Sequence, residues 1–302
     1  MNPQDFEYLA ENLDTSGIFG CDSSLTNIFL YEKQYGISTE IKENIFFRTY
    51  NQKNQKSYAF PLPLKNAPQD YLKTALKIIL QTENPALCLI TQEQKNKIDE
   101  ILRNNFPTYH VDWKTDRADT DYIYLQKNLA ELRGDILQKK KNHVSKFLRT
   151  YENQWTFKTY PENDILPDIL LTEQKWLQEK NAQTDPTLLQ EQKLIQKTCE
   201  NATKLKIRAA VLYVNGDPVA MTMASPINNT VLDVHFEKAL SPFSTNGAYA
   251  AINNFFAKSA QDFLYFNREE DLGLEGLRKA KLSYKPEILL DKFYGKIISG
   301  KN

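Results

Sequence analysis

Cysteine and long apolar runs are scarce in this chain. Three cysteines occur in 302 residues, Cys21, Cys88 and Cys199, and no two of them form a CxxC pair. This spacing argues against a disulfide framework or a structural zinc site, so we expect no bound metal. No stretch approaches the ~20 apolar residues that cross a bilayer, and the polar residues 1–12 do not resemble a secretory signal. We therefore expect a cytoplasmic protein without integral membrane association.

An excess of charge of one sign is also absent. Lys plus Arg and Asp plus Glu both number 38, so the formal net charge is zero. No global field then draws the chain to nucleic acid or to an anionic membrane, although local clusters still can. The hydrophobic content of 41% is that of a globular protein, and the length fits two domains that each bury a core.

Apolar spacing and turn signals predict alternating helices and strands in both halves. In the first half we expect helices within 5–35, a hairpin of 44–50 and 56–64 around a polar turn at 51–55, then helices and strands to residue 113. In the second half we expect a basic helix at 134–151, a strand at 155–160, helices at 166–180 and 186–205, a hairpin of 207–214 and 218–224, a strand at 231–236, a helix at 247–260, a strand at 263–266 and a helix at 274–282. We place the domains at 1–118 and 119–302, with 121–129 as a strand between them.

The order of elements in the second half is typical of one α/β (α+β) fold. Helix, hairpin, strand, helix, strand, helix is the order of the GNAT acyltransferases, the acyl-CoA N-acyltransferase-like fold. In that fold two central strands splay, and the opened cleft takes the acyl donor. The C-terminal half is therefore predicted to be GNAT-like, with a ligand cleft near its central strands.

The strand at 231–238 carries candidates for a general base. Strict alternation places Asp233, His235 and Glu237 on the face opposite the apolar residues. Alternate strand positions lie roughly 7 Å apart, which is too far for all three side chains to bind one ion directly. A base drawn from His235, Glu237 or Glu269 is favoured because acylation of an amine requires removal of a proton. His235 fits equally well as a hydrogen-bonded structural residue.

The segment 263–284 is the densest in polar residues. A short strand ends in Asn267, Arg268 and Glu269, and Gly273 and Gly276 open the next helix. Acids at the start of that helix and bases at its end complement the helix dipole, which is one interpretation. The other is that the two glycines let a ligand or a neighbouring backbone approach closely, at the strand end where α/β clefts bind ligands.

The basic helix at 134–151 is the third candidate. Lys139, His143 and Lys146 share one face, and Asn142, Lys146 and Arg149 share another. A solvated basic face and an anion site for phosphates of a coenzyme or of RNA are both open interpretations.

At these three places the chain resembles the phosphatidylglycerol lysyltransferase C-terminal domain family. The matching stretches are Lys139-Lys140-Lys141-Asn142-His143-x-x-Lys146-Phe147; His235-x-Glu237-Lys238-Ala239 with Gly247-Ala248-Tyr249 and Asn253; and Asn267-Arg268-Glu269-x-Asp271-Leu272-Gly273-x-Glu275-Gly276-Leu277-Arg278-Lys279-Ala280-Lys281-Leu282-Ser283-Tyr284-x-Pro286. The resemblance implies two fused GNAT-like domains. It also implies that the matched polar residues bind substrate or donor: Lys139, Asn142, His143, Lys146, Lys238, Gly247, Tyr249, Asn253, Asn267, Arg268, Asp271, Gly273, Gly276, Arg278, Lys281 and Tyr284.

The resemblance implies transfer of an aminoacyl group from charged tRNA. Acyl-coenzyme A is the other donor to consider, but residues 240–247 keep only a remnant of the glycine-rich loop that binds its pyrophosphate. We expect an acyl- or aminoacyltransferase that acts on an amine or hydroxyl of a small-molecule acceptor and needs no cofactor. Arg268, Lys281 and the Lys139–Lys146 face would hold donor phosphates, and Glu237 or Glu269 would act as the base. A non-catalytic GNAT-like protein that binds a small ligand or RNA is the alternative, and an RNA-binding module using the basic helix is a third.

Overall fold

The computed structural model describes residues 3–52, 55–180 and 184–300 of the chain. These residues form two compact units that exchange segments. Unit 1 comprises 1–121, 270–274 and 289–302, and unit 2 comprises 122–269 and 275–288. Each unit contains helices and one mixed sheet, so the predicted α/β class is confirmed. Among the described residues, no helix combines the length and the apolar character that a membrane span requires.

Unit 1 is built on a sheet in the order β1-β2-β3-β5-β14-β6, with β4 paired to β2. The strands are β1 (Ile37–Lys42), β2 (Ile45–Gln52), β3 (Gln55–Tyr58), β4 (Leu62–Pro63), β5 (Ala86–Thr91), β6 (Tyr109–Thr115) and β14 (Lys292–Ser299). The helices are α1 (Pro3–Asn12), α2 (Leu25–Tyr31), α3 (Tyr71–Leu80) and α4 (Gln92–Asn105), with 3-10 turns η1 (Cys21–Ser23) and η2 (Arg117–Asp119). The predicted hairpin is the β2–β3 pair; residues 53–54 of its predicted turn lie outside the described residues.

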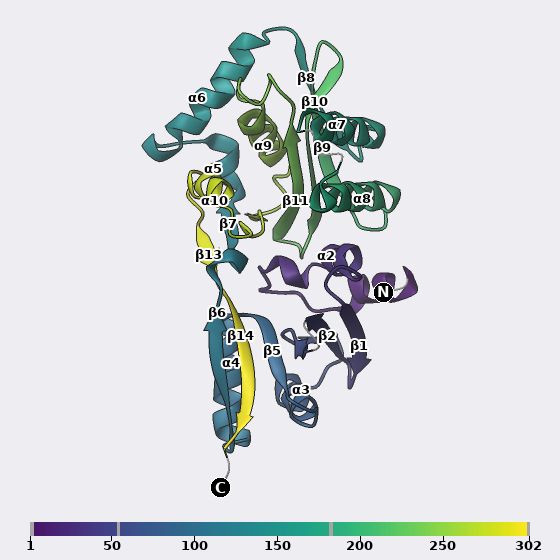
Figure 1. The fold of residues 1–302 in the computed structure, drawn as a ribbon, viewed down its shortest axis with the longest axis vertical. Coiled ribbons are helices and arrows are strands. Elements are labelled where there is room, and N and C mark those ends of the chain that lie inside the picture. Colours follow the sequence, from purple (N-terminus) through teal and green to yellow (C-terminus); the bar gives the residue numbers. More distant parts are fainter. Residues whose placement is uncertain (1–2, 53–54, 181–183, 301–302) are drawn as a thin grey trace. The chain divides into compact units, whose positions relative to one another are not determined.

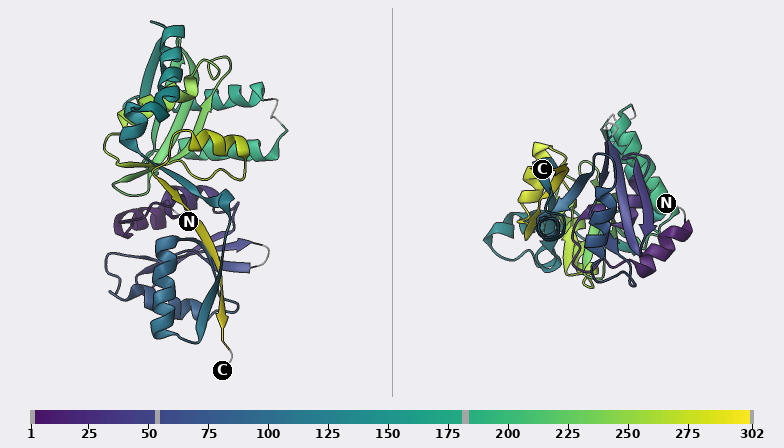
Figure 2. Two further views of the ribbon diagram at one scale, coloured as in Figure 1. Left: turned by 90° about the vertical axis from the view of Figure 1, so that its left-hand side faces the viewer. Right: turned by 90° about the horizontal axis from the view of Figure 1, so that it is seen from below.

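The last strand of the chain belongs to unit 1. β14 pairs antiparallel with β5 on one side and with β6 on the other, and the yellow β14 runs beside blue strands in Figures 1 and 2. A single boundary at residue 118 therefore does not describe this division. The reason is physical: a strand's own pattern indicates its buried face, but it does not indicate which sheet the strand will join.

Unit 2 has a sheet in the order β13-β7-β12-β11-β10-β9-β8. Its strands are β7 (Asp121–Leu125), β8 (Trp155–Tyr160), β9 (Arg208–Val214), β10 (Asp217–Pro226), β11 (Val231–Ala239), β12 (Tyr265–Asn267) and β13 (Ile288–Leu290). Its helices are α5 (Gln126–Glu131), α6 (Asp135–Thr150), α7 (Leu166–Glu179), α8 (Pro186–Glu200), α9 (Ala248–Ser259) and α10 (Glu275–Leu282). The predicted strand 121–129 was too long, because α5 begins at Gln126 and buries Leu129 as a helical residue.

Two parallel strands in the middle of the unit 2 sheet, β11 and β12, separate after a short ladder. The β11–β12 ladder runs from Val231–Tyr265 to Asp233–Asn267, and β11 then continues to Ala239. Helix α9 packs on one side of this sheet, and α7 and α8 pack on the other (Figure 1). The residues of β11 beyond Asp233 and those following β12 therefore border the place where the strands separate.

Helix α9 begins against the backbone of α6. Gly247, just before α9, has a φ of 99°, and a Cβ there would lie far inside van der Waals distance of the His143 carbonyl oxygen. Gly247 is therefore required both by its left-handed backbone and by the close approach of α6.

Gly247→Ala is expected to destabilise the protein by ~1–3 kcal/mol more than Gly216→Ala, because a clash is added to the cost of positive φ. Gly216 is the matched control, since its φ is 86° and no atom lies within 4 Å of a Cβ placed there. Urea unfolding followed by circular dichroism measures both. Equal losses for the two variants would contradict the close approach of α6.

Candidate functional site

A bulge in β11 changes the predicted alternation. Met223 pairs with Phe236 and Ala224 pairs with Val234, so His235 is an extra residue on this strand. Such a bulge shifts the phase of the side chains that follow. The prediction that Glu237 continues the row of Asp233 and His235 was therefore wrong.

Glu237 forms an ion pair with Arg268 where β11 and β12 part. Arg268 Nη2 donates to Glu237 Oε1 over 2.9 Å, and Asn253 of α9 donates through Nδ2 to Glu237 Oε2 over 3.2 Å. Both charged side chains are largely buried, with 12% exposure for Arg268 and 14% for Glu237. Among the described residues, Arg268 Nη1 has no hydrogen-bond partner. The arrangement presents a carboxylate and a guanidinium donor side by side.

Two tyrosines and a lysine surround this ion pair. The Arg268 guanidinium carbon lies 5.0 Å from the Tyr284 ring centroid and 5.7 Å from that of Tyr124. Lys140 of α6 places its Nζ 4.0 Å from the Tyr284 centroid, a favourable cation–π distance. Burial raises the pKa of Tyr284 to about 12, so its hydroxyl stays protonated at neutral pH.

Lys140 was missed among the predicted site residues. The two predicted basic faces used Lys139, His143 and Lys146, and Asn142, Lys146 and Arg149; all of these side chains are exposed except that of His143, which is half-buried. A signal was nevertheless available, because Lys140 shares the helical stripe of Leu137, Val144 and Phe147, all of which are buried. A lysine within an apolar stripe must either snorkel to water or meet a partner inside.

A second cluster of polar side chains surrounds His235. Ser225 Oγ lies 2.8 Å from His235 Nε2, and Glu269 Oε1 lies 3.1 Å from Nδ1. Asp233 Oδ2 lies 3.7 Å from the same Nδ1. Asp233, His235 and Glu269 offer ligand atoms within 4.8 Å of one another, a spacing that fits a cation. With both ring nitrogens in hydrogen bonds, His235 fits the structural interpretation.

Lys238 follows Glu237 in β11, and its side chain lies on the opposite face of the sheet, against α7 and α8. Its ammonium bonds to Glu191 of α8, lies 4.0 Å from Glu173 Oε2 and lies 3.6 Å from the Trp176 ring centroid. The Glu173 side chain is 1% exposed, and neither of its oxygens has a hydrogen-bond partner among the described residues. Burial raises the pKa of Glu173 to about 7.

Glu173 is expected to make the protein less stable as pH rises. Its native pKa of about 7 exceeds the ordinary 4.5. The stability that the protonated carboxyl contributes is therefore fully present below pH 4.5 and is lost as pH rises to about 7. Glu173→Gln removes this titration and is expected to exceed the wild type in stability at pH 8 by roughly 2–3 kcal/mol, with little difference near pH 4.5. Melting temperatures of the wild type and of Glu173→Gln between pH 4.5 and 8 measure this difference, and exposed Glu200→Gln is the control. A constant difference at all pH values would contradict the raised pKa.

Other predicted residues contact the backbone. Lys146 Nζ donates to the Thr245 carbonyl over 2.8 Å, and Lys281 Nζ donates to the carbonyls of Arg268 and Glu269 over 2.5 and 3.1 Å. Glu269 has a positive φ of 55°, so Lys281 supports the turn that aims Arg268 and Glu269. The Asn267 side chain accepts from Glu269 N over 2.7 Å and supports the same turn.

The remaining predicted positions are Asp271, Gly273, Gly276, Arg278 and Tyr249. Asp271 and Gly273 belong to unit 1, where the Asp271 carboxylate accepts from Gly273 N and lies 3.4 Å from Arg117 Nη1. Among the described residues, no protein atom outside its own helix and chain neighbours lies within 4 Å of a Cβ placed on Gly276, so no neighbouring backbone approaches there, and the predicted approach of a ligand stays a prediction. Arg278 is half-buried on α10, and Tyr249 is partly exposed in the first turn of α9.

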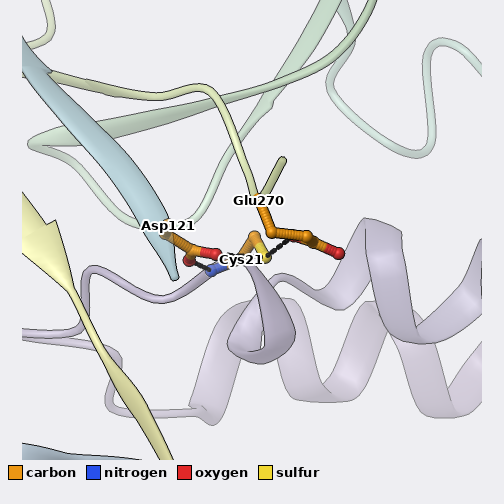
Figure 3. A group of neighbouring side chains, drawn as sticks. All are labelled: Cys21, Asp121 and Glu270. Carbon is orange, nitrogen blue, oxygen red and sulfur yellow. Dashed lines mark hydrogen bonds between the residues drawn. The ribbon is translucent and has the colours of Figure 1, made fainter. Parts of the chain in front are cut away.

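Unit 1 contains a buried cluster that the sequence did not indicate. Cys21, Asp121 and Glu270 converge as drawn in Figure 3, with the Cys21 thiol 3.3 Å from Asp121 Oδ1 and 3.5 Å from Glu270 Oε2. Lys292 Nζ lies 2.6 Å from Asp121 Oδ1 and 2.7 Å from Asp22 Oδ2. The ammonium of Lys292 therefore takes the position that a cation would need in this cluster, and burial raises the pKa of the Cys21 thiol.

The fold and the parted strands define a GNAT-like protein. The family model "Phosphatidylglycerol lysyltransferase, C-terminal" matches residues 15–295, and the chain belongs to this family, as predicted. A conserved protein of unknown function from Bacteroides thetaiotaomicron is 29% identical, with 99% of this chain and 98% of that one covered and a TM-score of 0.86.

Two further solved structures share the fold at low identity. L-PGS from Bacillus licheniformis has a TM-score of 0.62 at 13% identity, covering 100% of this chain and 93% of that one. FemX has a TM-score of 0.64 at 8% identity, covering 99% and 96%. The predicted GNAT-like fold is confirmed.

Proposed function

We propose that this protein transfers an aminoacyl group from aminoacyl-tRNA to an amine or hydroxyl acceptor, and that unit 2 holds the reacting groups. The observation that carries the proposal is the Glu237–Arg268 pair, because it joins the two strands at the point where they part. GNAT-like proteins hold the acyl donor at this point. Membership in the lysyltransferase family supports an aminoacyl donor.

The two side chains suit acyl transfer without a covalent enzyme intermediate. The Glu237 carboxylate can take a proton from the attacking amine or hydroxyl. Arg268 Nη1, a buried donor with no partner among the described residues, can stabilise the negative charge that develops on the ester carbonyl oxygen. The remaining contribution is the positioning of donor and acceptor.

The start of α9 supports tRNA over acyl-coenzyme A as the donor. A pyrophosphate would bind the backbone N–H groups at this helix N-terminus. Here the His143 backbone lies against Gly247, Lys146 bonds to the Thr245 carbonyl, and Asn246 donates to the Tyr151 hydroxyl over 2.9 Å. Coenzyme A would have to displace α6 to reach these groups.

The test is incubation with radiolabelled aminoacyl-tRNAs and, separately, acyl-coenzyme A, each with glycinamide, amino acids or polyols as acceptors. We expect loss of label from tRNA with its appearance on an acceptor, and no loss of acyl-coenzyme A. Binding of charged tRNA without turnover would favour the RNA-binding alternative. A rise in melting temperature with a small ligand, again without turnover, would favour a non-catalytic binding protein.

A further inference from the structure

We infer that Lys140 is the general acid of this site, and that it protonates the ribose oxygen as the aminoacyl ester bond breaks. Lys140 has this role only within the proposed function. Neither the family motif nor the comparisons assign a role to this residue, and three observations point to it: its place on α6, its contact with Tyr284 and the charges around it.

The position of Lys140 on its helix directs it inward. It lies on the same stripe as the buried Leu137, Val144 and Phe147, whereas Lys139 and Lys141 on either side are exposed. Its ammonium lies over the ring of Tyr284, and Arg268 lies over the same ring. Tyr284 therefore brings Lys140 to the Glu237–Arg268 pair.

The charged groups around Lys140 make it a better acid than an ordinary lysine. Burial has the largest effect, and the positive charges of Arg268 and Lys139 act in the same direction, while Glu237 opposes them. On its own helix, His143 also lies within electrostatic reach. Burial and the charges of Arg268 and Lys139 outweigh Glu237 and lower the pKa of Lys140 to about 8. At neutral pH the group is then mostly protonated, yet it gives up its proton far more readily than a solvated ammonium.

The proposed step balances in atoms and protons. The acceptor nitrogen or oxygen forms a bond to the ester carbonyl carbon, and its proton passes to Glu237. The bond from that carbon to the ribose oxygen breaks, and the ribose oxygen takes a proton from the Lys140 ammonium. Glu237 then releases its proton to solvent, and Lys140 regains one. The products are the aminoacylated acceptor and tRNA with a free hydroxyl.

The experiment uses bulk tRNA charged with radiolabelled amino acids, with glycinamide as the amine, over about pH 6 to 9.5. Wild-type kcat/KM is expected to fall as pH rises above about 8, because the acid form of Lys140 is lost. Lys140→Arg and Lys140→Met are both expected to lower kcat by ~100-fold or more and to abolish that decline. Affinity for charged tRNA, measured by filter binding, is expected to remain close to that of the wild type in Lys140→Arg. Exposed Lys127→Met is the charge-matched control and should behave as the wild type.

Four results would overturn the assignment. Wild-type rates and pH dependence in Lys140→Arg would show that only the positive charge matters. A loss of tRNA affinity with kcat intact in Lys140→Met would make Lys140 a phosphate contact. If the folded wild type transfers nothing from any charged tRNA, the proposed function itself fails and the role of Lys140 fails with it. If the wild type transfers aminoacyl groups and substitution of Lys140 changes neither the rate nor its pH dependence, the role of Lys140 is refuted while the proposed function stands.

Discussion

Glu237→Gln is expected to reduce kcat/KM for aminoacyl transfer by ~100-fold or more in the folded protein, and also to lower the melting temperature, because the buried Arg268 guanidinium loses its counter-charge. Glutamine has nearly the same size as glutamate, and its amide oxygen can still accept a hydrogen bond from Arg268 or Asn253. It cannot take up a proton near neutral pH. The variant therefore separates the proton-accepting role of Glu237 from its contribution to packing.

The choice of Glu237 over the other predicted bases follows from their partners. His235 has Ser225 on one ring nitrogen and Glu269 on the other, so neither is directed at a substrate. Glu269 is joined to that histidine. Glu237 lies instead against Arg268, whose other terminal nitrogen has no partner in the described part of the chain. Glu269→Gln is accordingly expected to lower kcat/KM much less than Glu237→Gln.

Initial rates with charged tRNA and glycinamide measure the effect, and circular dichroism checks the fold. Exposed Glu152→Gln removes one carboxylate elsewhere in unit 2 and should leave the rate unchanged. If Glu237→Gln transfers at the wild-type rate while Glu269→Gln is inactive, the base is Glu269, and the His235 group rather than the Glu237–Arg268 pair is the reactive centre.

The elements of unit 2 were predictable because their signals are local. The basic helix, the strand at 155–160 and the hairpin around Asn215 and Gly216 all lie within a residue or two of their expected positions. Both turn residues have positive φ, 52° and 86°, as an Asn-Gly hairpin turn requires. Each of these features depends on a short window of sequence, so no information about the rest of the fold is needed.

The site was only partly predictable, because its geometry depends on non-local pairing. Glu237, Arg268 and Tyr284 were candidates, and the structure brings them together. The bulge at His235 arises from the register between β10 and β11, which the alternation within β11 alone cannot reveal. Lys140 was passed over because it belongs to neither of the two predicted basic faces and shares its stripe with apolar residues.

The roles of the glycines also depended on tertiary contacts. Gly247 was predicted to bind the donor, yet the structure places the carbonyl of His143 against it. Gly276 was predicted to let a ligand or a neighbouring backbone approach, and no neighbouring backbone of the described chain lies within 4 Å of a Cβ placed there. A glycine in a sequence indicates that space or an unusual backbone is needed, but it does not identify the group that comes close.

Lys292→Met is expected to destabilise unit 1 by ~3–5 kcal/mol, the usual cost of removing one member of a buried ion pair. Lys292 is almost fully buried, and its ammonium lies 2.7 Å from Asp22 Oδ2 and 2.6 Å from Asp121 Oδ1. Methionine has a similar volume, so packing is largely retained. The loss then measures the cost of leaving the Asp22 and Asp121 carboxylates without the ammonium of Lys292.

Hydrogen exchange followed by mass spectrometry locates the loss in unit 1, because peptides from β5, β6 and β14 should lose protection first. Lys296→Met is the matched control, since Lys296 is exposed on the same strand. Adding Asp121→Asn to Lys292→Met should recover part of the stability, because one unpaired charge is removed. A loss under ~1 kcal/mol in Lys292→Met would show that the ion pairs of this cluster stabilise the protein no more than ordinary surface ion pairs do. It would mean that the carboxylates are protonated or hydrated, and that β14 is held mainly by its ladders with β5 and β6.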